Sequence, residues 1–83
     1  MTTHVLKTWP EYFEAVRSGR KRFEYRRDDR GFAEGDVLVL REYNPETGLY
    51  SGRKLFLAVT YVLRGDFVPQ GWAILSVAET AGV

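Results

Sequence analysis

The sequence contains no cysteine and a single histidine, His4, among its 83 residues. Without cysteine there is no disulfide, no thiolate zinc site and no cysteine nucleophile, and one histidine cannot form a multi-histidine metal site. The sequence therefore predicts no metal and no cofactor. His4 itself is expected to be a hydrogen-bonded strand residue and not a proton shuttle.

Long apolar runs are also missing. The unbroken apolar stretches are only a few residues long, whereas a helix that crosses a bilayer needs about 20 such residues. Residues 1–20 show no apolar segment of the kind found in signal peptides. We therefore expect a soluble, cytoplasmic protein without a membrane partner.

The composition that is present suits one compact domain. Hydrophobic residues make up 45% of the chain, charged residues 28% and aromatic residues 14%, which is a globular composition. A chain of this length buries about 63% of the surface that its extended form exposes. We expect a single domain over residues 1–83, with its core between about residues 4 and 78.

Positive charge is concentrated in one segment, although the formal net charge is only +1. Between residues 17 and 30, seven cations stand against three anions, and the rest of the chain carries three more anions than cations. This uneven distribution predicts a basic side that attracts anions.

One helix is predicted to begin after Thr8, which is expected to cap its first turn. Trp9, Phe13 and Val16 recur at the spacing of one helix face, so we expect them to pack against the rest of the domain. Gly19 is expected to end the helix, because glycine readily adopts the left-handed conformation found after a last helical turn.

Five strands are predicted around that helix, at about residues 4–7, 21–26, 37–43, 53–63 and 72–78. In the second strand Phe23 and Tyr25 alternate with charged residues, which predicts that these two rings face the core. Strands this long in a short chain cannot form a flat sheet with water on both faces. The expected fold class is α+β, mainly β: a five-stranded barrel or half-barrel, with one helix between strands 1 and 2 closing one end.

The segment Gly19-Arg20-Lys21-Arg22-Phe23-Glu24-Tyr25-Arg26 follows the pattern G-x-K-x-x-E-x-R. With this pattern the sequence resembles the ASCH domains (activating signal cointegrator homology), a branch of the PUA-like superfamily. Further likeness, to short single-domain bacterial and phage proteins, lies in the His-x-Leu-Lys opening, the Trp-Pro-Glu-Tyr-Phe helix start and the Arg-Arg-Asp-Asp-Arg-Gly-Phe loop. The resemblance covers about residues 4–78. It implies a PUA-like β-barrel that binds RNA or a modified nucleoside.

The motif supplies the candidate binding residues. We expect Lys21, Glu24 and Arg26 to line one cleft, with the two cations on phosphate and Glu24 either on a base edge or orienting Arg26. Strict alternation places Lys21 with Phe23 and Tyr25, so a ligand-facing Lys21 is expected to need a bulge or a position at the barrel mouth. The flanking residues expected to attract the backbone of RNA or a nucleotide-like ligand are Arg20, Arg22, Arg27 and Arg30. Plain solvated surface charge is the competing interpretation for Arg17, Arg27 and Arg30. The candidates for base stacking are Trp9, Tyr25, Tyr43 and Trp72.

Two other functions stay open at this point. Some small ASCH proteins are amidohydrolases that remove an acyl group from the N4 amine of cytidine, using the motif lysine, a threonine three residues later and a distant glutamate. Here Lys21 matches the lysine, and Glu24 stands where the threonine would be. In such an enzyme Lys21 would be a base or nucleophile and Glu24 a proton carrier or orienting group. The other possibility is an interaction module whose basic face meets an acidic protein.

Overall fold

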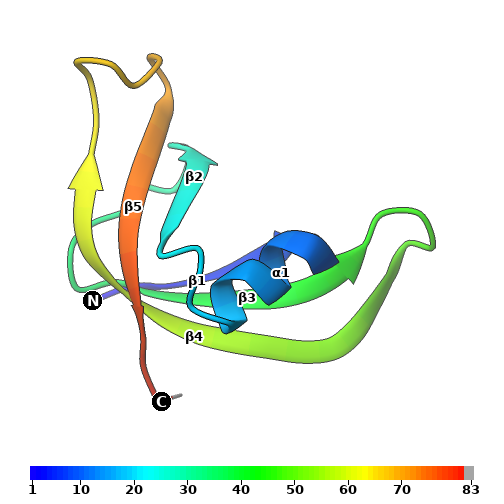
Figure 1. Cartoon of the computed structure of the whole chain (residues 1–83). Helices are drawn as coiled ribbons and strands as arrows, with labels where there is room; N and C mark the ends of the chain where they lie inside the picture. Colours follow the sequence, from blue (N-terminus) through cyan, green and yellow to red (C-terminus); the bar gives the residue numbers. More distant parts are fainter. Residues whose placement is uncertain (82–83) are drawn as a thin grey trace.

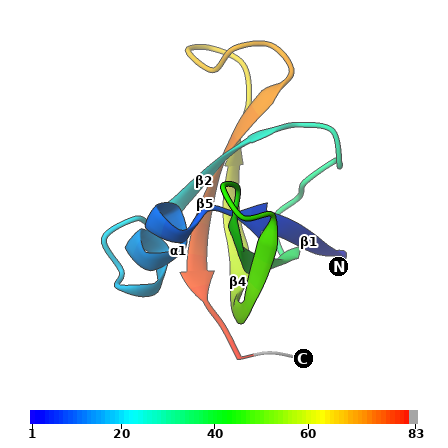
Figure 2. The same cartoon turned by 90° about the vertical axis from the view of Figure 1, so that its right-hand side faces the viewer.

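A computed structural model describes residues 1–81. Five strands form one sheet in the spatial order β1-β3-β4-β5-β2, and one helix lies between the first two strands along the chain (Figure 1). The elements are β1 (Thr3–Thr8), α1 (Pro10–Arg17), β2 (Phe23–Arg27), β3 (Val37–Asn44), β4 (Leu49–Leu63) and β5 (Trp72–Glu79). The sheet curls around α1 as a half-barrel with β1 and β2 at its two edges (Figure 2). The predicted fold class is confirmed in its half-barrel form.

The curvature of the sheet comes from β4, which pairs with two strands, β3 and β5. Residues 49–58 pair with β3 and residues 57–63 pair with β5, both antiparallel. In the first part, residues 51–53 stand opposite a single residue of β3, and Gly52 within this bulge has a φ of 92° that favours glycine. In the second part, Thr60 has no partner on β5. The bulge at residues 51–53 lies in the β3–β4 hairpin, which projects at the right of Figure 1, and the irregularity at Thr60 lies where β4 pairs with β5.

The core lies on the concave side of the sheet, against α1. Phe13 and Val16 of the helix are buried in one cluster with leucines of β3, β4 and β5, among them Leu38, Leu40, Leu57 and Leu75. Full burial of one such side chain stabilises a fold by about 1.5–3 kcal/mol. The predicted packing stripe is therefore confirmed for Phe13 and Val16. It is wrong for Trp9, which is 48% exposed.

The prediction that Thr8 caps the helix is wrong. Thr8 is the last residue of β1 and is 3% exposed, and Trp9 takes the N-cap position with an extended backbone and no side-chain cap. The strand runs one residue further than predicted, which turns Thr8 inward. At the other end Gly19 has a φ of 85°, which confirms that glycine ends the helix.

The number and order of the predicted strands are confirmed, but two strands begin elsewhere. β4 begins at Leu49 instead of residue 53, because its bulge lets pairing continue through a polar stretch. β2 begins at Phe23 instead of residue 21, because the Lys21 amide donates to the helix carbonyl of Ala15 at 2.9 Å and not to a neighbouring strand.

A buried polar pair ties β1 to the turn before β3. His4 Nε2 lies 2.8 Å from Asp36 Oδ2, and the amides of Thr2 and Ala33 donate to the same carboxylate at 3.1 and 3.0 Å. The expected hydrogen-bonded role of His4 is thus confirmed. Burial by itself raises the pKa of Asp36, but the hydrogen bonds from His4 and the two amides outweigh it and hold that pKa below its usual value.

We expect this lowered pKa to make Asp36 a source of acid sensitivity. A carboxyl group with a depressed folded-state pKa stabilises the fold above its unfolded pKa, and that stabilisation disappears as the pH falls through the folded pKa. Asp36→Asn is expected to be less stable than wild type at pH 6 by about 1–2 kcal/mol. The gap should begin to shrink below about pH 4, where Asp36 of the unfolded wild-type chain takes up its proton, and should keep shrinking until the pH has passed the lower folded-state pKa.

Urea unfolding followed by tryptophan fluorescence, between pH 6 and pH 2.5, measures that gap. Asp29→Asn is the control, because the Asp29 side chain is 62% exposed. A difference between wild type and Asp36→Asn that does not change with pH contradicts the prediction.

Candidate functional site

The two edges of the half-barrel are joined by arginine side chains. Arg26 of β2 donates to the carbonyl of Lys7 and the hydroxyl of Thr8 on β1, both at 3.2 Å. Further along, Arg30 donates to the carbonyl of Val5 at 2.9 Å. The carbonyls of an edge strand are acceptors that another strand would otherwise use. Within residues 1–81, the seam between β1 and β2 is therefore closed by side chains and not by backbone pairing.

A groove of about 700 Å³ opens at this seam, between the end of β1, the start of α1, β2 and the first residue of β5. One carboxylate, that of Glu24, lines it together with four cations, Lys7, Lys21, Arg26 and Arg27. The groove therefore carries an excess of three positive charges in a chain whose net charge is +1. Such a concentration of one sign in a hollow attracts anions.

Glu24 lies at the centre of the charged cluster and is 2% exposed. Its Oε2 accepts a hydrogen bond from Lys21 Nζ at 2.7 Å, and its Oε1 accepts one from Arg26 Nε at 3.0 Å. Each carboxylate oxygen is thus held by a cation. Of the two roles predicted for Glu24, orienting Arg26 is the one that this geometry favours, and it orients Lys21 as well.

Lys21 reaches the groove without a bulge, from the turn before β2 at the open seam of the half-barrel, so of the two expected alternatives the bulge is not the one found. The residue precedes β2, and Phe23 and Tyr25, the residues with which alternation groups it, line the groove themselves. Lys21 Nζ also donates to the carbonyl of Phe23 at 2.9 Å. A nucleophilic amine would have to give up both this bond and the one to Glu24, so the contacts favour an ion-pair role over the hydrolytic one.

The prediction that Phe23 and Tyr25 face the core is wrong, because each ring is 46% exposed. The face of β2 that turns inward carries Glu24 instead. Tyr25 stacks on Trp72 of β5 with ring centroids 4.9 Å apart and an interplanar angle of 26°. The guanidinium of Arg27 lies 4.9 Å from the centroid of the Trp72 ring, so one wall of the groove is a stack of two rings and a cation.

A second aromatic pair comes from the start of α1. Trp9 and Tyr12 are each 48% exposed, and their rings stack with centroids 6.3 Å apart. Both residues line the groove. Trp9 therefore faces the groove and does not pack against the core with Phe13 and Val16.

Three of the predicted arginines do not line the groove. Arg20 bonds to a hydroxyl and Arg22 to a carbonyl in the turn after α1, and Arg30 bonds to β1. Arg22 lines a smaller hollow of about 270 Å³ beside the end of the helix. Arg27 does line the groove, and among residues 1–81 its guanidinium takes part in no ion pair. The structure thus brings together Lys21, Glu24, Arg26 and Arg27 of the predicted set.

Lys7 and Tyr12 are groove residues that the sequence did not predict as part of the site. Lys7 lies on the first strand and meets the motif only through the folding of the sheet, so no sequence spacing signals the contact. Tyr12 falls on the same side of the helix start as Trp9, and the two rings stack. Its partial exposure depends on how the helix is rotated against the sheet.

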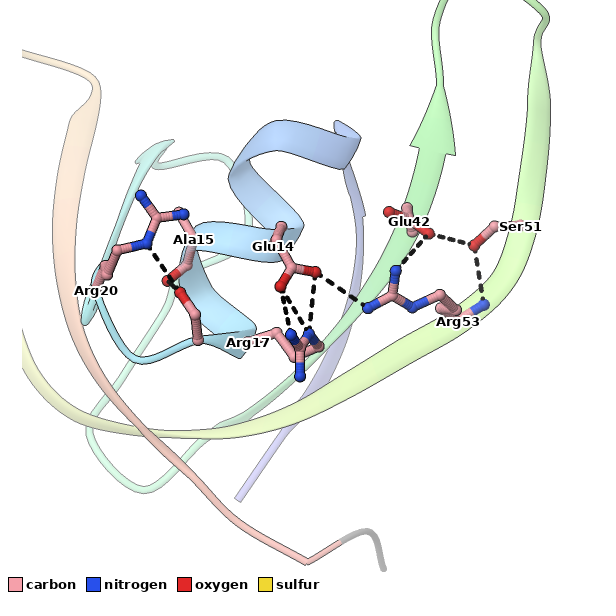
Figure 3. A network of polar contacts seen from close by, with 8 residues as sticks. Glu14, Ala15, Arg17, Arg20, Glu42, Ser51 and Arg53 are labelled. Carbon is pink, nitrogen blue, oxygen red and sulfur yellow. Dashed lines mark hydrogen bonds and ion pairs between the residues drawn. The ribbon is translucent and has the colours of Figure 1, made fainter.

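A separate polar network fastens α1 to the hairpin (Figure 3). Glu14 bonds to Arg17 and lies 3.4 Å from Arg53 NH2, whose other terminal nitrogen is 3.6 Å from Glu42. The hydrogen bond from Arg17 is the main cause that lowers the pKa of Glu14 to about 2. Ser51, in the β4 bulge, donates to Glu42 at 2.6 Å. This network holds the helix that carries Trp9 and Tyr12.

Neither a metal-binding cluster nor a membrane-spanning helix is found in residues 1–81. That part of the chain holds no cluster of three or more His, Asp or Glu side chains able to bind a metal ion. Its helix is too short to span a membrane.

The fold and the groove define a small half-barrel domain with a basic, aromatic-lined groove at its seam. The chain belongs to the family described as Domain of unknown function (DUF3850), whose sequence profile matches residues 3–77. It is also similar to an uncharacterized 12.9 kDa protein in the GpA 3′ region of Escherichia phage P2, with 39% identity over 59 residues, or 71% of this chain. The chain spans about half of that relative, since the match covers 52% of its length.

Proposed function

We propose that this protein binds RNA, or a nucleotide-like ligand, in the groove at the seam between β1 and β2. The observation that carries the proposal is the groove's combination of an excess of three positive charges with half-exposed aromatic rings. Unstacked bases bind on aromatic side chains, while cations in the same groove neutralise the phosphates. The bases are expected on Tyr25 and on the Trp9–Tyr12 pair.

The hydrogen-bond donors that remain free decide which cations meet phosphate. Arg26 donates to Glu24, Lys7 and Thr8, so it serves mainly to frame the groove. Lys21 uses two of its three N–H donors and has one left. We assign the phosphate contacts to Lys21, Arg27 and the ammonium of Lys7.

Membership of the ASCH branch of PUA-like domains is part of the same proposal. The motif G-x-K-x-x-E-x-R lies where α1 passes into β2, and its lysine, glutamate and arginine form one cluster at the groove. A motif whose three side chains meet at a hollow supports a binding role for that motif. The half-barrel with one helix between β1 and β2 is compatible with the kinship.

A salt titration tests the proposal directly. A fluorescently labelled uridine tetranucleotide should bind, and its association constant should fall with salt along a log–log slope of about −2.1 if three phosphates are neutralised. Arg27→Gln is expected to reduce that slope to about −1.4. Fluorescence anisotropy between 25 and 200 mM salt measures both values.

Arg20→Gln is the matched control for this titration. It removes the same charge from an exposed arginine that does not line the groove, and it should leave the slope unchanged. A salt-independent association constant, or the absence of binding to any RNA pool, contradicts the proposed function. Uridine monophosphate as competitor shows whether the groove accepts a single nucleotide.

A further inference from the structure

A row of three cations crosses the outer face of the sheet, opposite the core. Lys7 of β1 pairs in register with Arg41 of β3, and Arg41 pairs with Lys54 of β4. All three side chains are exposed, and within residues 1–81 none of them takes part in an ion pair. Like charges at directly opposite positions of neighbouring strands repel one another and destabilise a sheet. We call these three residues the cationic row.

Aromatic rings lie under the cationic row but do not neutralise it. Lys7 Nζ is 4.3 Å from the centroid of Tyr43, Arg41 is 3.9 Å from that of Tyr50, and Lys54 is 5.9 Å from that of Phe56. The rings hold the three cations through cation–π contacts.

The next positions along the same face offer no neutralising anion. They are Val5, Val39 and Phe56, which follow one another in register across the same three strands. The cationic row is therefore an unneutralised basic strip over an apolar and aromatic surface. A strip of this kind fits a ligand that brings several negative charges at once.

The cationic row begins where the groove ends, because Lys7 belongs to both. We infer that the row receives the phosphate backbone of a single-stranded nucleic acid whose bases lie in the groove. The inference rests on the proposed function and makes the ligand a polynucleotide instead of a single nucleotide. Neighbouring strands are about 4.8 Å apart, so the row extends the binding surface by about 10 Å.

The test compares two ligand lengths, a uridine tetranucleotide and a uridine dodecanucleotide, by fluorescence anisotropy between 25 and 200 mM salt. The tetranucleotide occupies the groove, whereas the dodecanucleotide also reaches Arg41 and Lys54. The log–log salt slope is expected to steepen from about −2.1 to about −3.5, because two more phosphates are neutralised. The double variant Arg41→Gln/Lys54→Gln should weaken dodecanucleotide binding by about tenfold and leave tetranucleotide binding unchanged.

The double variant Arg20→Gln/Arg22→Gln is the matched control, because it removes the same charge away from the cationic row. Circular dichroism establishes that both variants stay folded. Equal slopes for the two ligands overturn the inference and leave the proposed function standing, whereas failure of both ligands to bind overturns both. If both double variants lose the same dodecanucleotide affinity, the attraction is a general effect of charge and the inference is overturned. The same conclusion follows if polyglutamate displaces the labelled dodecanucleotide as well as the unlabelled dodecanucleotide does.

Discussion

Replacing Glu24 by alanine is expected to lower the free energy of unfolding by about 3 kcal/mol, because breaking a buried ion pair from one side costs about 3–5 kcal/mol. The variant leaves Lys21 and Arg26 side by side without their shared anion. The lower end of the range applies because the two cationic side chains are 19% and 25% exposed and can turn toward water. For a domain of this size the melting temperature should fall by roughly 12–24 °C. Urea unfolding and thermal melts measure the two quantities.

Two further variants show whether the loss of stability in Glu24→Ala comes from losing this buried carboxylate. Glu24→Gln keeps an oxygen that accepts a hydrogen bond from one cation, so its loss should be smaller, about 2 kcal/mol. Glu34→Ala removes a carboxylate from an exposed turn residue and should change stability by less than about 0.5 kcal/mol. If Glu24→Ala is as stable as Glu34→Ala, the carboxylate does not hold the charged cluster together.

Elements whose signals are local could be predicted from the sequence. The helix stripe of Phe13 and Val16, the glycine that ends the helix and the apolar run Val37–Leu40 each depend on neighbouring residues only. The half-barrel followed from the mismatch between long strands and a short chain. The ends of β2 and β4 were less predictable, because a bulge and a single amide bond to the helix decide them.

The orientation of β2 illustrates what local patterns leave open. A period of two separates Phe23 and Tyr25 from Glu24 and Arg26, but it does not say which set faces inward. Apolar residues normally take the buried face, and here a carboxylate takes it because two cations neutralise it there. Lys21 completes this neutralisation from outside the strand, so the arrangement depends on tertiary structure.

The candidate site could be predicted only in part, because some of its contacts are local in sequence and others depend on tertiary structure. The motif places Glu24 and Arg26 on one face of a strand, two residues apart, so their pairing follows from sequence. Lys7 reaches the groove and the cationic row only because β1 pairs parallel to β3, with partners 34 residues apart in the chain. No periodicity within either strand signals that pairing.

Tyr25→Ala is expected to weaken binding of the uridine tetranucleotide by about 30-fold, because stacking of a base on an aromatic ring contributes about 1–3 kcal/mol. Tyr25 is the exposed ring of the stack with Trp72, so a base can continue that stack. Since the stack needs the ring and not the hydroxyl, Tyr25→Phe should retain nearly all of the affinity. Fluorescence anisotropy at a fixed 50 mM salt measures the three dissociation constants.

Tyr61→Ala is the matched control, because Tyr61 is a tyrosine of similar exposure, 52%, that does not line the groove. Equal affinities for Tyr25→Ala and Tyr61→Ala contradict the stacking role of Tyr25. The salt slope adds a second criterion, because removing a ring leaves the number of neutralised phosphates unchanged whereas Arg27→Gln reduces it. A Tyr25→Ala variant with weaker binding and an unaltered slope therefore separates base stacking from phosphate contact within one groove.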